Sequence, residues 1–104
     1  MKFIIRPRRA GKTTEAIRLA VAHNAIIVSG ERHECYLIEQ LAKQLGYRIQ
    51  QPLTVDEFIH GHFYNRKGES FVIDNLELLL ERPSKGLPII AVTMSCYDEC
   101  DAAA

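Results

Sequence analysis

The sequence of 104 residues has little of what marks several classes of protein. Its charges cancel, with 13 Lys and Arg residues against 13 Asp and Glu residues, so no strongly basic surface for nucleic acid is indicated over the whole chain. No apolar run approaches the length of a transmembrane helix. The three cysteines, an odd number, predict free thiols in a reducing compartment rather than a disulfide framework. Because the N-terminus also shows no secretory pattern, we expect a soluble cytoplasmic protein without a membrane partner.

What is present is the composition of an ordinary globular domain, with 47% hydrophobic and 25% charged residues. We expect one domain over residues 1–104, long enough to bury a core but near the small end for an α/β fold. Short apolar runs alternate with segments of helical periodicity. The apolar runs predict strands over residues 3–6, 25–29, 70–74 and 87–92, with residues 47–50 as a short additional strand.

The helical segments cover residues 13–23, 32–45, 54–63 and 76–81. The third of these opens with a capping-box signature, Thr54 followed by Glu57. Strands that alternate with helices predict an α/β fold, a three-layer sandwich with a mostly parallel sheet covered on both faces. Right-handed crossovers then place the carboxyl ends of the strands at one edge, where ligands of open α/β sheets bind.

One stretch organises the chain, Pro7-Arg8-Arg9-Ala10-Gly11-Lys12-Thr13-Thr14, which lies between a predicted strand and a predicted helix. In that setting G-K-[ST] is typical of a phosphate-binding loop. Gly11 lets the backbone approach a ligand closely, and the amides of residues 8–14 cradle phosphate oxygens at a helix N-terminus. The Lys12 ammonium can reach the β- and γ-phosphates, and the Thr13 hydroxyl can ligate Mg²⁺. The alternative is a basic turn that caps an ordinary helix.

A carboxylate follows a second apolar run, at the end of Phe71-Val72-Ile73-Asp74. This run resembles a Walker B strand, in which the final Asp holds the Mg²⁺ of a bound nucleotide. The alternative is an Asp that only caps the helix after it. Thr93 directly follows the predicted strand over residues 87–92. We expect the loop, Asp74 and Thr93 to converge at one edge of the sheet.

With these motifs, nearly the whole chain resembles P-loop NTPases of the additional-strand, RecA-like class, which includes helicases and viral DNA-packaging motors. The resemblance implies a truncated P-loop core whose strands are ordered first, fourth, third, second. It implies that ATP and Mg²⁺ are bound, with Thr13 and Asp74 as metal ligands. It also implies that Thr93 senses the γ-phosphate, for which a plain turn residue is the alternative.

Two finer resemblances suggest a role in nucleic-acid transactions. The run Ile26–Ser29, the helix after it and the segment Leu53–Phe58 resemble the first ATPase domain of superfamily-one helicases. The phosphate-binding loop resembles the variant Walker A of phage terminase large subunits, which suggests a phage-encoded protein. By that analogy Arg8 contacts the phosphates in cis, while solvated surface charge is the alternative for Arg8 and Arg9.

The chain departs from the family pattern at two residues. Arg6 stands where the full loop pattern has its first Gly, and Asn75 stands where the family has a catalytic Glu after the Walker B Asp. Asn can orient a water but cannot accept its proton, so hydrolysis should be impaired. Glu77 is a possible substitute. A fifth strand and a second RecA-like domain are also missing, so we expect a homo-oligomer, a protein partner or a purely ligand-like use of nucleotide.

The sequence therefore predicts an ATP- and Mg²⁺-binding protein with weak or partner-dependent ATPase activity. The residues predicted to take part in catalysis are Lys12, Asp74, Asn75, Glu77 and Thr93. A non-catalytic interaction module with a degenerate nucleotide site is the main alternative. A small-molecule kinase is a further one, which the lack of a recognisable lid disfavours.

Overall fold

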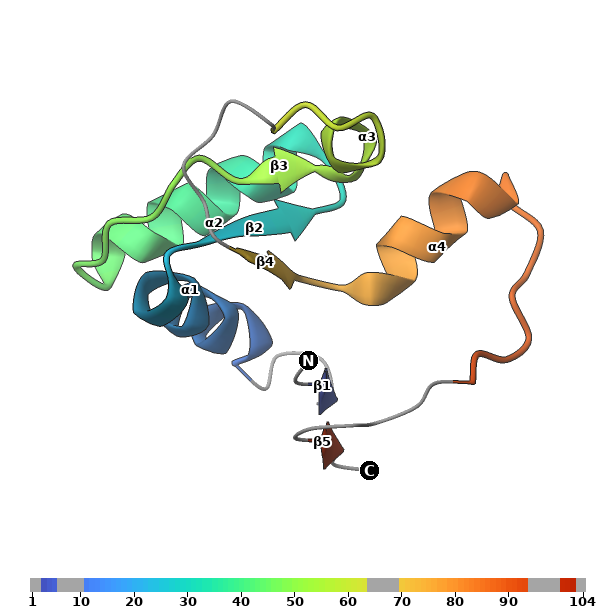
Figure 1. Cartoon of the computed structure of the whole chain (residues 1–104), viewed down its shortest axis with the longest axis horizontal. Helices are drawn as coiled ribbons and strands as arrows, with labels where there is room; N and C mark the ends of the chain where they lie inside the picture. Colours follow the sequence, from blue (N-terminus) through green and yellow to red (C-terminus); the bar gives the residue numbers. More distant parts are fainter. Residues whose placement is uncertain (1–2, 6–10, 64–69, 94–99, 103–104) are drawn as a thin grey trace.

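A parallel sheet of three strands forms the centre of the fold, and β2 (Ala25–Ser29) is its middle strand. The computed structural model describes residues 3–5, 11–63, 70–93 and 100–102. In it, β2 pairs with β3 (Leu53–Thr54) along one edge and with β4 (Ser70–Ile73) along the other (Figure 1). Both pairings are parallel, so the carboxyl ends of the strands lie at the same edge of the sheet.

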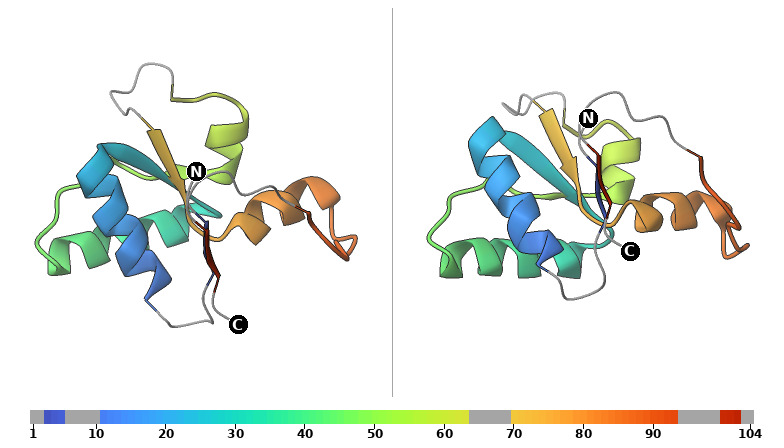
Figure 2. Two further views of the ribbon diagram at one scale, coloured as in Figure 1. Left: turned by 60° about the horizontal axis from the view of Figure 1, so that its bottom comes forward. Right: turned by 90° about the horizontal axis from the view of Figure 1, so that it is seen from below.

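The helices of the described residues are α1 (Lys12–His23), α2 (Arg32–Gln44), α3 (Val55–Ile59) and α4 (Leu76–Ser84). Helices α1 and α2 run alongside the strands, whereas α4 extends away from the end of β4 (Figures 1 and 2). The order β2, α2, β3 is a crossover between parallel neighbours, although the sequence predicts a strand over residues 47–50 rather than at Leu53–Thr54.

Strand β2 is buried along its whole length because its side chains alternate between two apolar clusters. Ala25 and Ile27 belong to the first cluster, and Ile26 and Val28 belong to the second. The neighbouring elements contribute Ile17, Ala20, Ile38 and Ala42 to the first cluster and Leu53 and Val55 to the second. A strand covered on both sides needs a continuous apolar run, and the β-branched sequence of β2 provides one.

The predicted capping box at the start of α3 is confirmed. The backbone N–H of Glu57 donates to Thr54 Oγ1 at 3.1 Å, and the Thr54 N–H donates to Glu57 Oε1 at 2.9 Å. Arg32 of α2 also reaches Glu57, with 3.0 Å between Nη2 and Oε1. The ion pair connects α3 to α2. The helix ends at Ile59, earlier than the predicted residue 63.

The strand predicted over residues 47–50 is wrong, because these described residues pair with no strand. Tyr47 and Ile49 pack against the first cluster instead. Pairing with β2 begins only at Leu53, opposite Val28. The apolar side chains of the segment therefore serve the core without a strand.

The strand predicted over residues 87–92 is also wrong. After α4 the chain continues without strand pairing through Thr93, and Leu87 and Ile90 are 74% and 97% exposed. This segment, residues 86–92, lines a groove together with side chains of α4. A short apolar run does not by itself distinguish a buried strand from an extended segment beside a helix.

The strand order implied by the resemblance is wrong in the described residues. β1 (Phe3–Ile5) pairs in parallel with β5 (Cys100–Ala102), and these two strands form a sheet separate from the other three. Within the described ranges, β4 has β2 as its one strand neighbour, so of the expected order only their adjacency is present.

The described residues thus form a compact α/β domain with a small parallel sheet and several helices. Cys35 lies buried in α2 as a free thiol that donates to the carbonyl oxygen of Leu53 at 3.4 Å. Burial raises the pKa of this thiol, which disfavours the reactive thiolate. Within the same ranges, no helix has the length and apolar character needed to cross a membrane.

Candidate functional site

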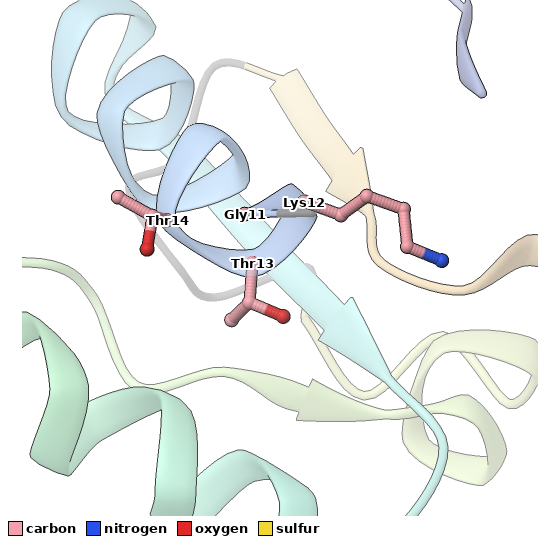
Figure 3. Close-up of a pocket in the computed structure, with 4 residues that line it drawn as sticks. All are labelled: Gly11, Lys12, Thr13 and Thr14. Atoms are coloured by element: carbon pink, nitrogen blue, oxygen red, sulfur yellow. The ribbon is translucent and has the colours of Figure 1, made fainter. Parts of the chain in front are cut away.

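The N-terminus of α1 forms one side of the candidate site. Gly11 precedes the helix with a φ of 81°, in the left-handed region that side chains rarely adopt, and its carbonyl accepts from the Glu15 N–H at 3.1 Å. A glycine at this position therefore avoids backbone strain. A cavity of about 230 Å³ lies against residues 11–14 (Figure 3). The first amides of α1 have no partner within the helix, so they are available to an anion at this end.

Thr13 and Asp74 join α1 to the carboxyl end of β4. The Thr13 hydroxyl donates to Asp74 Oδ2 at 3.2 Å, although the two residues are 61 positions apart in the sequence. The Asp74 N–H also donates to the carbonyl oxygen of Val28 at 2.9 Å, which holds Asp74 beside the end of β2. The hydroxyl and the carboxylate that the sequence predicts as metal ligands are therefore in direct contact.

Lys12 and Asn75 form a second contact between the same two elements. Lys12 Nζ donates to Asn75 Oδ1 at 3.4 Å, and Figure 3 shows the lysine side chain extended toward the end of β4. Asn75 has a φ of 64°. Asn is one of the few residues with a side chain that adopts this left-handed conformation readily. The turn that follows β4 therefore gives a conformational reason for Asn at this position.

Asp74 is only 7% exposed, and its surroundings act on its charge in opposite directions. Burial raises the pKa of the Asp74 carboxyl above its usual range, and this is the largest effect. The hydrogen bond from Thr13 and the charge of Lys12 lower the pKa, while the carboxylates of Glu34 and Glu77 raise it. A buried carboxylate of this kind gains most from a nearby cation.

Ser29 and Glu34 border the site, and neither is among the site residues predicted from the sequence. Ser29 ends β2, is 1% exposed, and donates its hydroxyl to Glu34 Oε2 at 3.2 Å. The backbone N–H of Gly30 donates to the same oxygen at 3.1 Å. Glu34 is the third residue of α2, but the N-cap residue is Glu31 rather than Ser or Thr, so the sequence carries no capping-box signature that would have pointed to it.

The remaining predicted residues lie in different places. Thr14 lines the cavity with Gly11, and its side chain points away from that of Lys12 (Figure 3). Glu77 is exposed in the first turn of α4. Thr93 is exposed at the end of the unpaired segment after α4, so the strand on which its predicted role depended is absent. The residues Arg6, Arg8, Arg9 and Ala10 lie outside the described part of the chain.

The donor set at the site suits a hard cation that a ligand also coordinates. Within the described ranges, no group of three or more His, Cys, Asp or Glu side chains is placed to hold a metal ion. Thr13 and Asp74 supply oxygen donors that are already within 3.2 Å of one another. Mg²⁺ is usually held by one or two such protein oxygens together with substrate phosphates and water, so the residues present fit it.

Comparison of the chain with protein-family models, with curated proteins and with solved structures finds no match. The chemistry of the site therefore rests on its own residues.

Proposed function

We propose that this chain is a minimal P-loop protein that binds ATP with Mg²⁺ and hydrolyses it slowly. The observation that carries the proposal is the contact between Thr13 at the start of α1 and Asp74 at the end of β4, with 3.2 Å between Oγ1 and Oδ2. Two oxygen ligands, a lysine and free helix amides meet at one edge of a parallel sheet, where phosphates bind in α/β proteins.

Each residue of the site has a distinct role in this proposal. Lys12 gives up its hydrogen bond with Asn75 and binds the β- and γ-phosphates. The backbone N–H groups of residues 11–14 donate hydrogen bonds to the phosphate oxygens at the positive end of α1. Thr13 and Asp74 hold Mg²⁺, directly or through water. Mg²⁺ supplies charge neutralisation of the phosphates when it is bound.

We propose further that the α/β domain is a truncated P-loop core of three layers. The alternation of β2 side chains between two apolar clusters supports this, because it requires covering elements on both faces of the strand. The separate pairing of β1 with β5 and the unpaired residues 87–93 depart from such a core. The helicase and terminase resemblances extend the proposal to nucleic-acid transactions, in which a protein partner or a second copy completes the site.

A non-catalytic module is the second candidate, because Asn75 replaces the expected catalytic carboxylate. Lys12 Nζ, at 3.4 Å from Asn75 Oδ1, then binds nucleotide without turnover. In this case bound ATP stabilises the folded state by mass action and dissociates without being hydrolysed.

Calorimetric titration with ATP, with and without Mg²⁺, tests the proposal together with a phosphate-release assay. Mg²⁺-dependent binding with slow phosphate release is expected. Binding without release favours the non-catalytic module. The absence of heat at millimolar ATP, in a protein that circular dichroism shows to be folded, would overturn both candidates.

A further inference from the structure

ATP hydrolysis is accelerated by a group that holds the attacking water and takes its proton, and Asn75 cannot take a proton. We propose that Glu34, at the start of α2, is this group. The inference rests on the proposed ATP site and adds a residue to it from an element that the sequence motifs do not include.

The backbone brings Glu34 to the site. Val28 pairs with Ile73 across β2 and β4, so the residues that follow them, Ser29 and Asp74, lie side by side at the edge where the strands end. The Asp74 N–H donates to the Val28 carbonyl oxygen at 2.9 Å and fixes this arrangement. Ser29 is hydrogen bonded to Glu34, which therefore lies one contact away from the residue beside Asp74.

Two hydrogen bonds orient the Glu34 carboxylate. The Ser29 hydroxyl at 3.2 Å and the Gly30 N–H at 3.1 Å both end on Oε2. Neither bond occupies Oε1, which can accept from a water molecule. A carboxylate that is held in place before the substrate arrives loses little freedom when it acts.

Glu77 is the competing carboxylate, and the structure favours Glu34. Glu34 is half-buried and tied to the end of β2, whereas Glu77 is exposed on α4, which leads away from the sheet (Figure 1). Both charges raise the pKa of Asp74, and the effect of Glu34 is the larger of the two. Glu34 is therefore electrostatically near the proposed metal ligand.

The step balances in atoms and charge. The water oxygen forms a bond to the γ-phosphorus, and the bond between this phosphorus and the bridging oxygen of the β-phosphate breaks. The electron pair of that bond stays on ADP, and the water proton passes to Glu34 and then to solvent. The products are ADP and inorganic phosphate.

The variant Glu34→Gln tests the proposal, because an amide oxygen can still accept from Ser29 and Gly30 but cannot take a proton. We expect phosphate release to fall about 100-fold while the Kd for ATP with Mg²⁺ stays within about twofold of the wild type. Glu39→Gln, which makes the same change of charge on the same helix, is the matched control and keeps the wild-type rate. Unfolding midpoints of both variants verify the fold.

Each other result overturns the inference. A normal rate in Glu34→Gln, or a fall in rate that appears only in Glu77→Gln, shows that Glu34 is not the base. Equal losses of rate and of ATP affinity in Glu34→Gln indicate a structural role alone. ATP binding without any wild-type turnover removes the inference and leaves the binding proposal standing, whereas no ATP binding removes the proposed function itself.

Ser29→Ala provides a second test that does not alter the carboxylate. Removing the hydroxyl frees one of the two bonds on Glu34 Oε2, and we expect phosphate release to fall about tenfold with ATP affinity unchanged. An unchanged rate would show that the orientation of Glu34 has no part in the reaction.

Discussion

Two isoleucines in similar apolar runs have opposite fates in this molecule. Ile27, in the middle of β2, is 1% exposed, whereas Ile90, in the segment after α4, is 97% exposed. The first run pairs with a strand on each side and is covered by helices, while the second has no strand pairing. Apolar composition alone therefore does not make a core strand. Partners on both edges and both faces do.

Shortening the two isoleucine side chains tests this difference in packing most directly. Ile27→Ala removes buried methyl groups from the first cluster, and we expect the free energy of unfolding to fall by about 2–5 kcal/mol. Ile90→Ala is the matched control and should change it by less than about 0.5 kcal/mol. Urea unfolding followed by circular dichroism measures both values. Similar losses in the two variants would mean that the segment after α4 is packed in solution.

The side chains at the carboxyl ends of β2 and β4 also have partners, since Ser29, Asp74 and Asn75 are each hydrogen bonded to a side chain of a helix. Lys12→Ala removes a cation whose ammonium lies 3.4 Å from Asn75 Oδ1 and which belongs to neither apolar cluster, so we expect the fold to remain intact. ATP affinity should fall about 100-fold, the loss expected for charge-assisted contacts to phosphate. Arg18→Ala, an exposed change on the same helix, should leave affinity unaltered. Unchanged affinity in Lys12→Ala, measured by calorimetry, would contradict the phosphate-binding role.

We expect the ionised Asp74 carboxylate to lower the stability of the folded protein. Its pKa is raised chiefly by burial, so the folded protein holds this proton more tightly than the unfolded chain does. The free energy of unfolding therefore falls as the pH rises from the ordinary Asp value of 3.8 through the raised value.

Asp74→Asn removes this penalty, and we expect its Tm at pH 7 to exceed that of the wild type by a few degrees. The difference should vanish below the ordinary Asp pKa, where both proteins are neutral at this position. The Mg²⁺ dependence of ATP binding should be lost in the same variant. A lower Tm for Asp74→Asn at pH 7, in calorimetric scans across pH, would show that the ionised carboxylate is stabilising.

The parts of the fold that follow from local signals were predictable. The continuous apolar run of β2 and the capping box of Thr54 and Glu57 each depend on neighbouring residues, and both are present as expected. The contact between Thr13 and Asp74 was expected from the carboxyl ends of one parallel sheet, and the contact is present. Because β1 lies in a separate sheet, the packing of α1 against β2 and β4 produces this contact instead.

The parts that depend on distant partners were not predictable. Residues 47–50 and 87–92 have strand-like composition, but whether such a run pairs depends on which edge of the sheet is accessible to it. The position of Glu34 beside the site depends on the register of β2 against β4, which places Ser29 next to Asp74. Because β2 is buried on both faces, its apolar pattern does not fix that register.

Asn75 stands where the family pattern has Glu, and the local backbone conformation explains this difference. Its φ of 64° lies in the left-handed region, where a side chain other than Asn or Asp costs about 1–2 kcal/mol. We therefore expect Asn75→Glu to lower the free energy of unfolding by about 1 kcal/mol, whereas Asn75→Gly, which fits this conformation, should cost less. Equal stability of the two variants in urea would contradict the left-handed turn. A stability loss confined to Asn75→Glu would mean that the turn after β4 disfavours a glutamate at this position, and that a proton acceptor has to come from another element such as α2.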